Sequence, residues 1–213
     1  MIHVEEQPEP SNFNAKVRVP GQRFLQQNSH RILHGTEFKK YWKHCLNDLR
    51  DAYKGICAYT ASYISVDAGH AVGSVDHYLP KSEAPNLVYE WSNYRFCNPK
   101  VNENKANSND VLDPFRIQNG WFVIDFTTFR VNPADTLPGD LKKAIQQTID
   151  QLRLNDDNRL AQPRANRVSE YINGEISLDY LRRKYPFIAF ELERQNLQET
   201  IKTRKTSAPR SAR

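Results

Sequence analysis

The chain has 213 residues, of which 38% are hydrophobic and 26% charged. This length can bury a substantial core without disulfide bonds, and no apolar run approaches the roughly 18 residues of a membrane-spanning helix, so a transmembrane helix is excluded. The three cysteines form an odd set, which argues against a disulfide-stapled secreted fold and favours the reducing cytoplasm. The first ten residues carry three Glu and no apolar stretch, so we also expect no secretory signal.

The net charge of +5 is concentrated in the last residues, 200–213, while residues 1–199 are neutral on balance. This segment contains no acidic residue, and its basic residues are Lys202, Arg204, Lys205, Arg210 and Arg213. We expect a basic, disordered, solubilising tail. The alternative is a basic arm that adds contacts to nucleic-acid phosphates.

The first third of the chain is predicted to contain an arm and one helix. Residues 1–35 combine scattered prolines with weak periodicity, so we expect an extended N-terminal arm. A helix is predicted after Thr36, a favourable N-cap residue, and Gly55 ends it. Apolar residues recur at helical spacing along it: Phe38, Trp42, Cys45, Leu46, Leu49 and Tyr53. Residues 56–64 are β-like.

The remaining elements predict an α+β fold, in which a small β-containing active region lies inside a mostly helical frame. We interpret 36–135 as the functional region, where Asn119-Gly120 between two β-rich runs is a strong hairpin signal. Residues 136–199 are predicted to be helical. A first helix has an apolar stripe, a second ends at Asn173-Gly174, and two more lie on either side of Pro186.

The residues that can carry chemistry lie close together in the sequence. Asp76-His77 falls in a short strand-like segment, where neighbouring side chains point to opposite faces. Asn93 opens a second β-like run, and Asn98-Pro99 has the residue types of a helix start. Asn102 and Lys105 follow three residues apart, so they share one face of that helix. The predicted order is strand, loop, strand and helix.

In type, order and spacing these residues resemble the core of the HNH nucleases. In that family the Asp of the Asp-His pair and a His or Asn on the helix hold a divalent metal. The family's His is the general base, and a central Asn steadies the loop between the strands. The resemblance therefore implies a ββα-metal core, with Asp76 and Asn102 as metal ligands and His77, Asn93 and Lys105 as catalytic residues.

The activity implied by this resemblance is hydrolysis of phosphodiester bonds in DNA. One divalent ion can hold the scissile phosphate, and an imidazole with a pKa near ~6.5 can take a proton from water at neutral pH. Oxygen ligands favour Mg²⁺ or Mn²⁺. Lys105 or Arg95 is expected to contact the phosphate. The other candidate contacts to nucleic acid are Lys81, Lys100, Lys202, Arg204 and Lys205.

Other polar residues near the core are interpreted as structural. Many HNH relatives bind a structural zinc through two Cys-x-x-Cys pairs, but only Cys57 and Cys97 flank the core here. Four thiolates cannot be assembled from them, so we expect no structural zinc and two buried cysteines. Asp113, which precedes a proline, favours a turn rather than a third metal ligand. His70 is interpreted as a loop or core histidine.

A wider resemblance covers roughly residues 56–170. It is to a bacterial HNH group that includes the nuclease partners of ATPases in Septu-type phage-defence systems. The similar segments are Pro80-Lys81-Ser82, Trp91-Ser92-Asn93, Leu112-Asp113-Pro114, and Leu152-Arg153-Leu154-Asn155 with Arg164 downstream. This implies an antiviral role and an ABC or RecF-like ATPase as partner. The alternatives are an RNA-cleaving toxin, or a non-catalytic subunit that keeps the fold and binds nucleic acid or an ATPase.

The basic tail leads to a first test. Deletion of residues 200–213 is expected to weaken DNA binding and to flatten its dependence on salt, because each phosphate contact contributes about 0.9 to the slope of log K against log salt. The single-turnover cleavage rate at saturating DNA is expected to stay the same. Binding titrations at several salt concentrations measure the slope, and an unchanged slope would mean that the tail only solubilises the chain.

Overall fold

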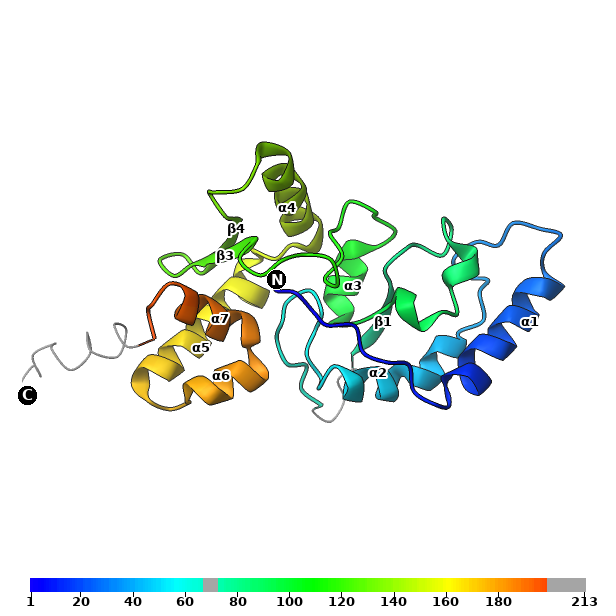
Figure 1. Ribbon diagram of the computed structural model, residues 1–213, viewed down its shortest axis with the longest axis horizontal. Helices are drawn as coiled ribbons and strands as arrows, with labels where there is room; N and C mark the ends of the chain where they lie inside the picture. The colour runs from blue at the N-terminus through cyan, green and yellow to red at the C-terminus, as the bar shows by residue number, and fades with distance from the viewer. Residues whose placement is uncertain (67–72, 199–213) are drawn as a thin grey trace, which may run out of the picture.

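The computed structural model describes residues 1–66 and 73–198 (Figure 1). The fold is α+β, as expected, with helices arranged around two small antiparallel sheets. The strands are β1 (Ser74–His77), β2 (Tyr94–Cys97), β3 (Phe122–Asp125) and β4 (Arg130–Pro133). The α-helices are α1 (Val19–Gln27), α2 (Leu46–Ala52), α3 (Pro99–Lys105), α4 (Gly139–Leu152), α5 (Gln162–Asn173), α6 (Leu178–Lys184) and α7 (Pro186–Arg194). Within the described residues, no helix combines the length and apolar character needed to cross a membrane.

The N-terminal region differs from the extended arm that we expected, because Asn14–Arg18 form a π-helical turn that continues into α1. Pro20 lies at the start of α1, where a missing N–H removes no intrahelical hydrogen bond. Phe13, Val17 and Phe24 are buried and anchor this helical segment to the core. The prolines were therefore a misleading signal, because a proline in the first turn is compatible with a helix.

The helix predicted after Thr36 begins later than expected. A 3-10 helix spans Tyr41–Cys45 and leads into α2. Glu37 closes a separate turn instead, since its carboxylate accepts the His34 N–H at 2.7 Å and its own N–H donates to the His34 carbonyl. The C-terminal end of this helical segment agrees with the prediction, because Gly55 turns the chain with a φ of +69°.

The second sheet contains a hairpin, but its turn is not at the predicted Asn119-Gly120. The strands β3 and β4 are joined by residues 126–129, where the Asp125 carboxylate accepts hydrogen bonds from the Thr127 N–H and the Thr128 hydroxyl, both at 2.8 Å. The segment before Asn119 is not a strand, because the N–H groups of residues 116 and 117 donate to the carbonyl of Asp113 in a turn. Asn119-Gly120 forms the turn that precedes β3.

The C-terminal helices follow the sequence signals closely. Gly174 ends α5 in the left-handed conformation with a φ of +78°. Ser177 caps α6, where its hydroxyl accepts the Tyr180 N–H at 3.0 Å. Pro186 separates α6 from α7, as predicted.

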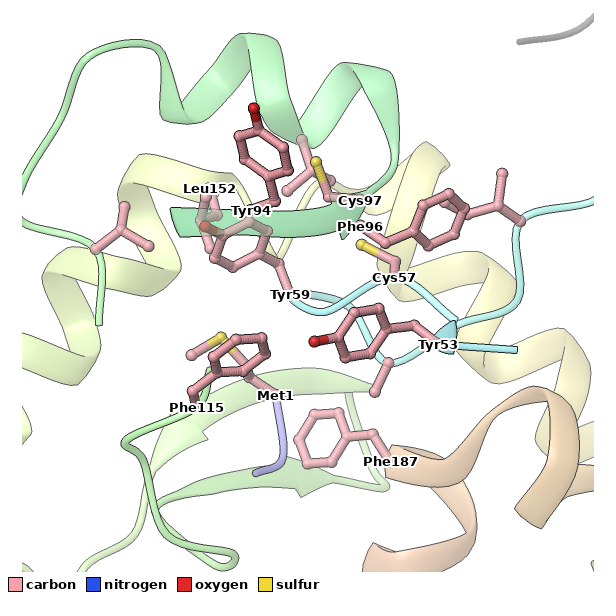
Figure 2. Close-up of a cluster of buried hydrophobic side chains, with 14 of the residues drawn as sticks. Met1, Tyr53, Cys57, Tyr59, Tyr94, Phe96, Cys97, Phe115, Leu152 and Phe187 are labelled. Carbon is pink, nitrogen blue, oxygen red and sulfur yellow. The ribbon is translucent and has the colours of Figure 1, made fainter. Parts of the chain in front are cut away.

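One hydrophobic cluster joins all parts of the described chain, from Met1 to Leu192. Figure 2 shows a part of it, in which Met1 and Phe115 lie between the β2 region and Phe187 of α7. Tyr59 and Phe96 cover the cluster from the side of β2 (Figure 2). The β-containing region and the C-terminal helices therefore share a core, which holds the first sheet in a fixed surrounding.

A glycine in α1 allows a close contact that can be tested. A Cβ at Gly21 would lie 2.1 Å from Cγ of Tyr89, so Gly21→Ala is expected to lower the free energy of unfolding, by about 1–3 kcal/mol through overpacking. Gly139→Ala is the matched control, since no heavy atom lies within 4 Å of its added Cβ. Urea denaturation measures both, and equal stability of the two variants would contradict the packing of Tyr89 on α1.

Candidate active site

The first sheet and α3 form a strand, strand and helix unit. β1 and β2 are antiparallel, with Asp76 opposite Arg95 and His77 opposite Tyr94. The helix α3 begins directly after β2, because the side chain of Asn98 accepts the Lys100 N–H at 2.8 Å as an N-cap. The end of β1 and the pocket-facing side of α3 are thereby brought together.

A pocket of about 370 Å³ lies against this unit. It is lined by Asp76 and His77 from β1 and by Asn102 from α3, together with the three lysines Lys40, Lys43 and Lys81. Among the described residues, Asp76 is the single acidic residue of the lining, so the lining residues carry a net positive charge. Three of the five residues that match the HNH pattern thus share one pocket, while Asn93 and Lys105 are buried and do not line it.

The Asp76 carboxylate is buried, with 2% of the residue exposed, and is held by two donors. The Tyr59 hydroxyl donates to Oδ2 at 2.5 Å, and Lys105 Nζ lies 3.3 Å from Oδ1. Burial raises the pKa of Asp76, and the ammonium of Lys105 and the Tyr59 hydrogen bond oppose this rise. Each carboxylate oxygen has a second lone pair, so the group can still accept a further ligand.

We expected Lys105 to contact the phosphate. In this structure the side chain is fully buried and does not extend into the pocket. Its Nζ also donates to the carbonyls of His77 at 3.2 Å and Tyr78 at 2.9 Å. The side chain crosses from α3 to the end of β1 and satisfies backbone acceptors there. Lys105 is therefore a positioning residue, which fixes Asp76 and the strand that carries it.

The imidazole of His77 has a defined tautomer. Its Nε2 lies 3.0 Å from the carbonyl oxygen of Val88, and because a carbonyl can only accept, Nε2 carries the proton and Nδ1 keeps a free lone pair. Trp42 and Tyr94 pack edge-on against the ring, with centroids at 4.7 and 5.2 Å. Burial and then the charge of Lys81 lower the pKa of His77 to about 3, so the ring is neutral at physiological pH.

Asn93 acts on the loop between the two strands. Its Oδ1 accepts the Leu79 N–H at 2.8 Å, and its Nδ2 donates to the carbonyls of Leu79 at 3.1 Å and Leu87 at 3.3 Å. Leu87 precedes Val88, whose carbonyl accepts from His77. Asn93 therefore positions the carbonyl that orients the imidazole, and it does not itself line the pocket.

The amide of Asn102 is oriented by β1. Its Nδ2 donates to the Ser74 hydroxyl at 3.3 Å and to the Val75 carbonyl at 3.5 Å, and its Oδ1 has no hydrogen-bond partner within residues 1–66 and 73–198. A carboxylate and an amide oxygen thus line the same pocket. Both are hard donors of the type that Mg²⁺ and Mn²⁺ prefer, so the residues fit the expected metal.

Arg95, an expected nucleic-acid contact, is buried and internally paired in this structure. The residue is 3% exposed, and its guanidinium makes a bidentate pair with Asp113 at 2.9 and 2.8 Å. It also lies 3.5 Å over the ring of Phe115. The cause is that β2 is buried on both faces, so a charged residue there needs an internal partner. Asp113 accepts the Phe115 N–H as well, which confirms its role in a turn.

The other candidate contacts differ in position. Lys81 lines the pocket, and its Nζ lies 4.6 Å over the ring of Trp42. Lys100 is in the first turn of α3, pairs with Glu103 at 2.7 Å, and is not part of the pocket. Six further residues of the sequence analysis lie outside the described residues: His70, Lys202, Arg204, Lys205, Arg210 and Arg213.

The sequence analysis missed three residues at this site. Lys40 and Lys43 line the pocket, and the run Phe-Lys-Lys-Tyr-Trp-Lys at 38–43 was a usable signal, because it alternates basic and aromatic residues. Tyr59 had no such signal, since nothing in the sequence indicates that its hydroxyl meets Asp76, 17 positions away.

The two cysteines near the core are buried, as expected. The Sγ of Cys57 accepts the Asn98 N–H at 3.3 Å, and the Sγ of Cys97 lies 3.3 Å from the Ser74 hydroxyl. Burial raises the pKa of the Cys97 thiol well above its usual range. Cys57 and Cys97 thus pack the base of the strand and helix unit.

No model of a known protein family matches this chain, and no curated protein is significantly similar to it. The residues of the pocket are therefore the basis for assigning a function.

The buried pair of Lys105 and Asp76 leads to a stability test. Lys105→Met leaves the carboxylate without its cation and is expected to destabilise the fold by about 3–5 kcal/mol at neutral pH. The pKa of Asp76, already raised by burial, then rises further. A carboxyl whose pKa is higher in the folded state loses stability as pH rises through that pKa, so the loss is expected to be smaller in acid.

The double variant Asp76→Asn with Lys105→Met is the control. It removes the unpaired charge and is expected to recover part of the loss. Urea denaturation at about pH 5 and about pH 8 measures both effects. Equal losses in the single and double variants at both pH values would show that the unpaired Asp76 carboxylate is not the cause of the loss.

Proposed function

We propose that this protein is a metal-dependent HNH endonuclease that hydrolyses phosphodiester bonds in DNA. The observation that carries the proposal is the joint lining of one pocket by Asp76, His77 and Asn102, which come from a strand and a helix of one strand, strand and helix unit. The same unit supports the ββα-metal interpretation. A positively charged pocket with one carboxylate is suited to a phosphate and a hard cation.

His77 supplies the general base in this proposal. The Val88 carbonyl fixes the proton on Nε2, which leaves the Nδ1 lone pair to take a proton from an attacking water. The low pKa of the ring keeps this nitrogen unprotonated before the reaction. A bound phosphate anion has the opposite effect to Lys81, since it stabilises the protonated ring and brings its pKa closer to neutrality.

The remaining residues of the pocket bind and orient the substrate. Lys40, Lys43 and Lys81 lie where the backbone phosphates of a nucleic acid would be held. Asp76 and Asn102 would hold the divalent ion, which when bound polarises the scissile phosphate and offsets charge on the leaving oxygen. Tyr59 and Lys105 keep the Asp76 carboxylate in place through the contacts described above.

We also propose that the protein works in the cytoplasm. The three cysteines are free and buried in this structure, which is suited to a reducing compartment. A nuclease that acts on intracellular DNA needs the same location.

His77→Ala is expected to abolish cleavage with little change in DNA affinity. A general base contributes about 10²–10⁴-fold or more to the rate, while the phosphate contacts of the lysines do not depend on this imidazole. His44→Ala is the matched control, since His44 is exposed on the neighbouring segment and lies outside the pocket lining. The assay compares plasmid DNA, single-stranded DNA and tRNA, with Mg²⁺ and with EDTA.

Three results are decisive in this assay. Near wild-type nicking by folded His77→Ala protein would refute the base assignment. Cleavage of tRNA alone would replace the DNA nuclease with the RNA-cleaving alternative. Binding of DNA without cleavage under any condition would favour a non-catalytic subunit.

The oxygen ligands lead to a prediction about the metal. We expect activity with millimolar Mg²⁺ or Mn²⁺ and little with Zn²⁺ or Ca²⁺, because hard ions prefer oxygen. Asn102→His is expected to shift the preference toward Ni²⁺ or Zn²⁺, and Asp76→Ala to lose activity with every metal. Metal titrations of cleavage measure this. Strong activation of the unmodified protein by Zn²⁺, and none by Mg²⁺, would show that Asn102 is not a ligand.

A further inference from the structure

A second pocket, of about 230 Å³, lies between α5 and the turn at residues 60–64. Its lining, within the part of the chain that the structure describes, contains three arginines and no acidic residue. The arginines are Arg159 from the π-helical segment Asp157–Ala161, and Arg164 and Arg167 from the first half of α5. This pocket has its own lining, and none of the residues of the candidate active site belongs to it.

Arg164 is the unusual member of this group. It is 8% exposed, and its guanidinium donates to the carbonyls of Phe129 and Leu154, but no carboxylate pairs with it within the described residues. Burial alone lowers its pKa to about 10, so it remains charged at neutral pH. Buried charges in proteins are normally paired. A guanidinium has five N–H donors, and those not used by Phe129 and Leu154 are available to an anion in the pocket.

The two other arginines differ in their pairing. Arg159 is exposed and makes no ion pair in the described part of the chain. Arg167 Nη1 lies 2.7 Å from Glu170 Oε2, yet this oxygen has no aligned hydrogen bond. Arg167 therefore forms an ion pair with Glu170 that lacks an aligned hydrogen bond. With Glu170 offsetting Arg167, the pocket keeps about two uncompensated positive charges.

The rest of the lining suits the remainder of a small ligand. Thr60 and Ser62 contribute hydroxyl groups, while Tyr185, Leu160 and Ile188 contribute ring and aliphatic surface. The volume is below the roughly 300 Å³ at which pockets for drug-sized ligands begin. It therefore suits one phosphate with one attached ring system, and it is too small for a duplex.

We propose that this pocket binds a phosphomonoester dianion, such as the 5′-phosphate of a mononucleotide or of a nucleic-acid end. A monoester carries about two negative charges at neutral pH and matches the uncompensated charge, whereas a backbone diester carries one. Arginine forks bind phosphate oxygens in pairs, which favours a group with three free oxygens.

The pocket adjoins the elements that build the candidate active site. Thr60 and Ser62 lie in the same turn as Tyr59, whose hydroxyl holds Asp76. Asn98, which also lines the pocket, caps the helix that carries Asn102. A ligand here therefore contacts both the turn and the cap that position the proposed metal ligands.

The test is calorimetric titration of the full chain in EDTA, so that cleavage does not interfere. The probes are inorganic phosphate, 5′-AMP, adenosine, and a short oligonucleotide with either a 5′-phosphate or a 5′-hydroxyl. We expect saturable binding of inorganic phosphate and 5′-AMP and no binding of adenosine, and we expect the 5′-phosphorylated oligonucleotide to bind more tightly than its 5′-hydroxyl counterpart. Tighter binding of 5′-AMP identifies a mononucleotide as the ligand, and tighter binding of the 5′-phosphorylated oligonucleotide identifies a nucleic-acid end.

The variants locate the site. Arg164→Gln is expected to weaken binding by about tenfold or more, since it removes a charge-assisted fork. Because Arg164 also supports the fold, the double variant Arg159→Gln with Arg167→Gln provides a second test on more accessible residues, with a similar loss expected. Arg182→Gln, at a surface pair with Glu193, is expected to bind normally.

Two outcomes would overturn the proposal. One is the absence of saturable binding of phosphate and 5′-AMP up to about 10 mM. A dissociation constant above this concentration is too weak for a specific site. The other is binding that survives in the double arginine variant and is lost in Lys81→Gln, which would assign the anion to the candidate active site instead.

Discussion

The contact on which the candidate site depends is the buried pair of Asp76 and Lys105. Lys105 reaches from α3 to β1 and binds at once a carboxylate and two backbone carbonyls. The Tyr59 hydroxyl completes the shell around the carboxylate. Taking two charges out of water is costly, and internal partners offset that cost only in good geometry. The pair therefore fixes the position of the helix against the strand, and with it the distance between the proposed metal ligands.

The histidine is placed by a second set of buried polar groups. Asn93 holds the loop on both sides, and the neighbouring carbonyl of Val88 accepts from His77 and from the hydroxyl of Tyr94. Each donor in this set has an acceptor, so the arrangement is stable in a low-dielectric interior. Because the proton of the His77 ring is fixed on Nε2, Nδ1 is the atom that can accept a proton.

Two buried arginines show how the same side chain can serve different ends. Arg95 meets Asp113 in a bidentate pair and stacks on Phe115, so its charge is compensated inside the protein. Arg164 donates hydrogen bonds to two backbone carbonyls, and its charge at the edge of a pocket has no carboxylate partner among the described residues. The sequence gives no means to separate them, because both lie in mixed polar segments, and the difference depends on which carboxylate folds next to each.

By itself, the sequence determined the local elements and the identity of the chemical groups. Some features depend only on residues that are near in the sequence: the cap at Asn98, the end of α5 at Gly174, and the spacing of Asp76-His77 from Asn102. For these features the sequence was sufficient to predict the local structure. The tertiary structure decided which charges face the pocket, because burial and ion pairing involve residues far apart in the chain. In the folded chain, Arg95 and Lys105 lie in the interior, and Lys40, Lys43 and Tyr59 lie at the site. The hairpin turn follows β3, where the side chain of Asp125 accepts the hydrogen bonds that close it.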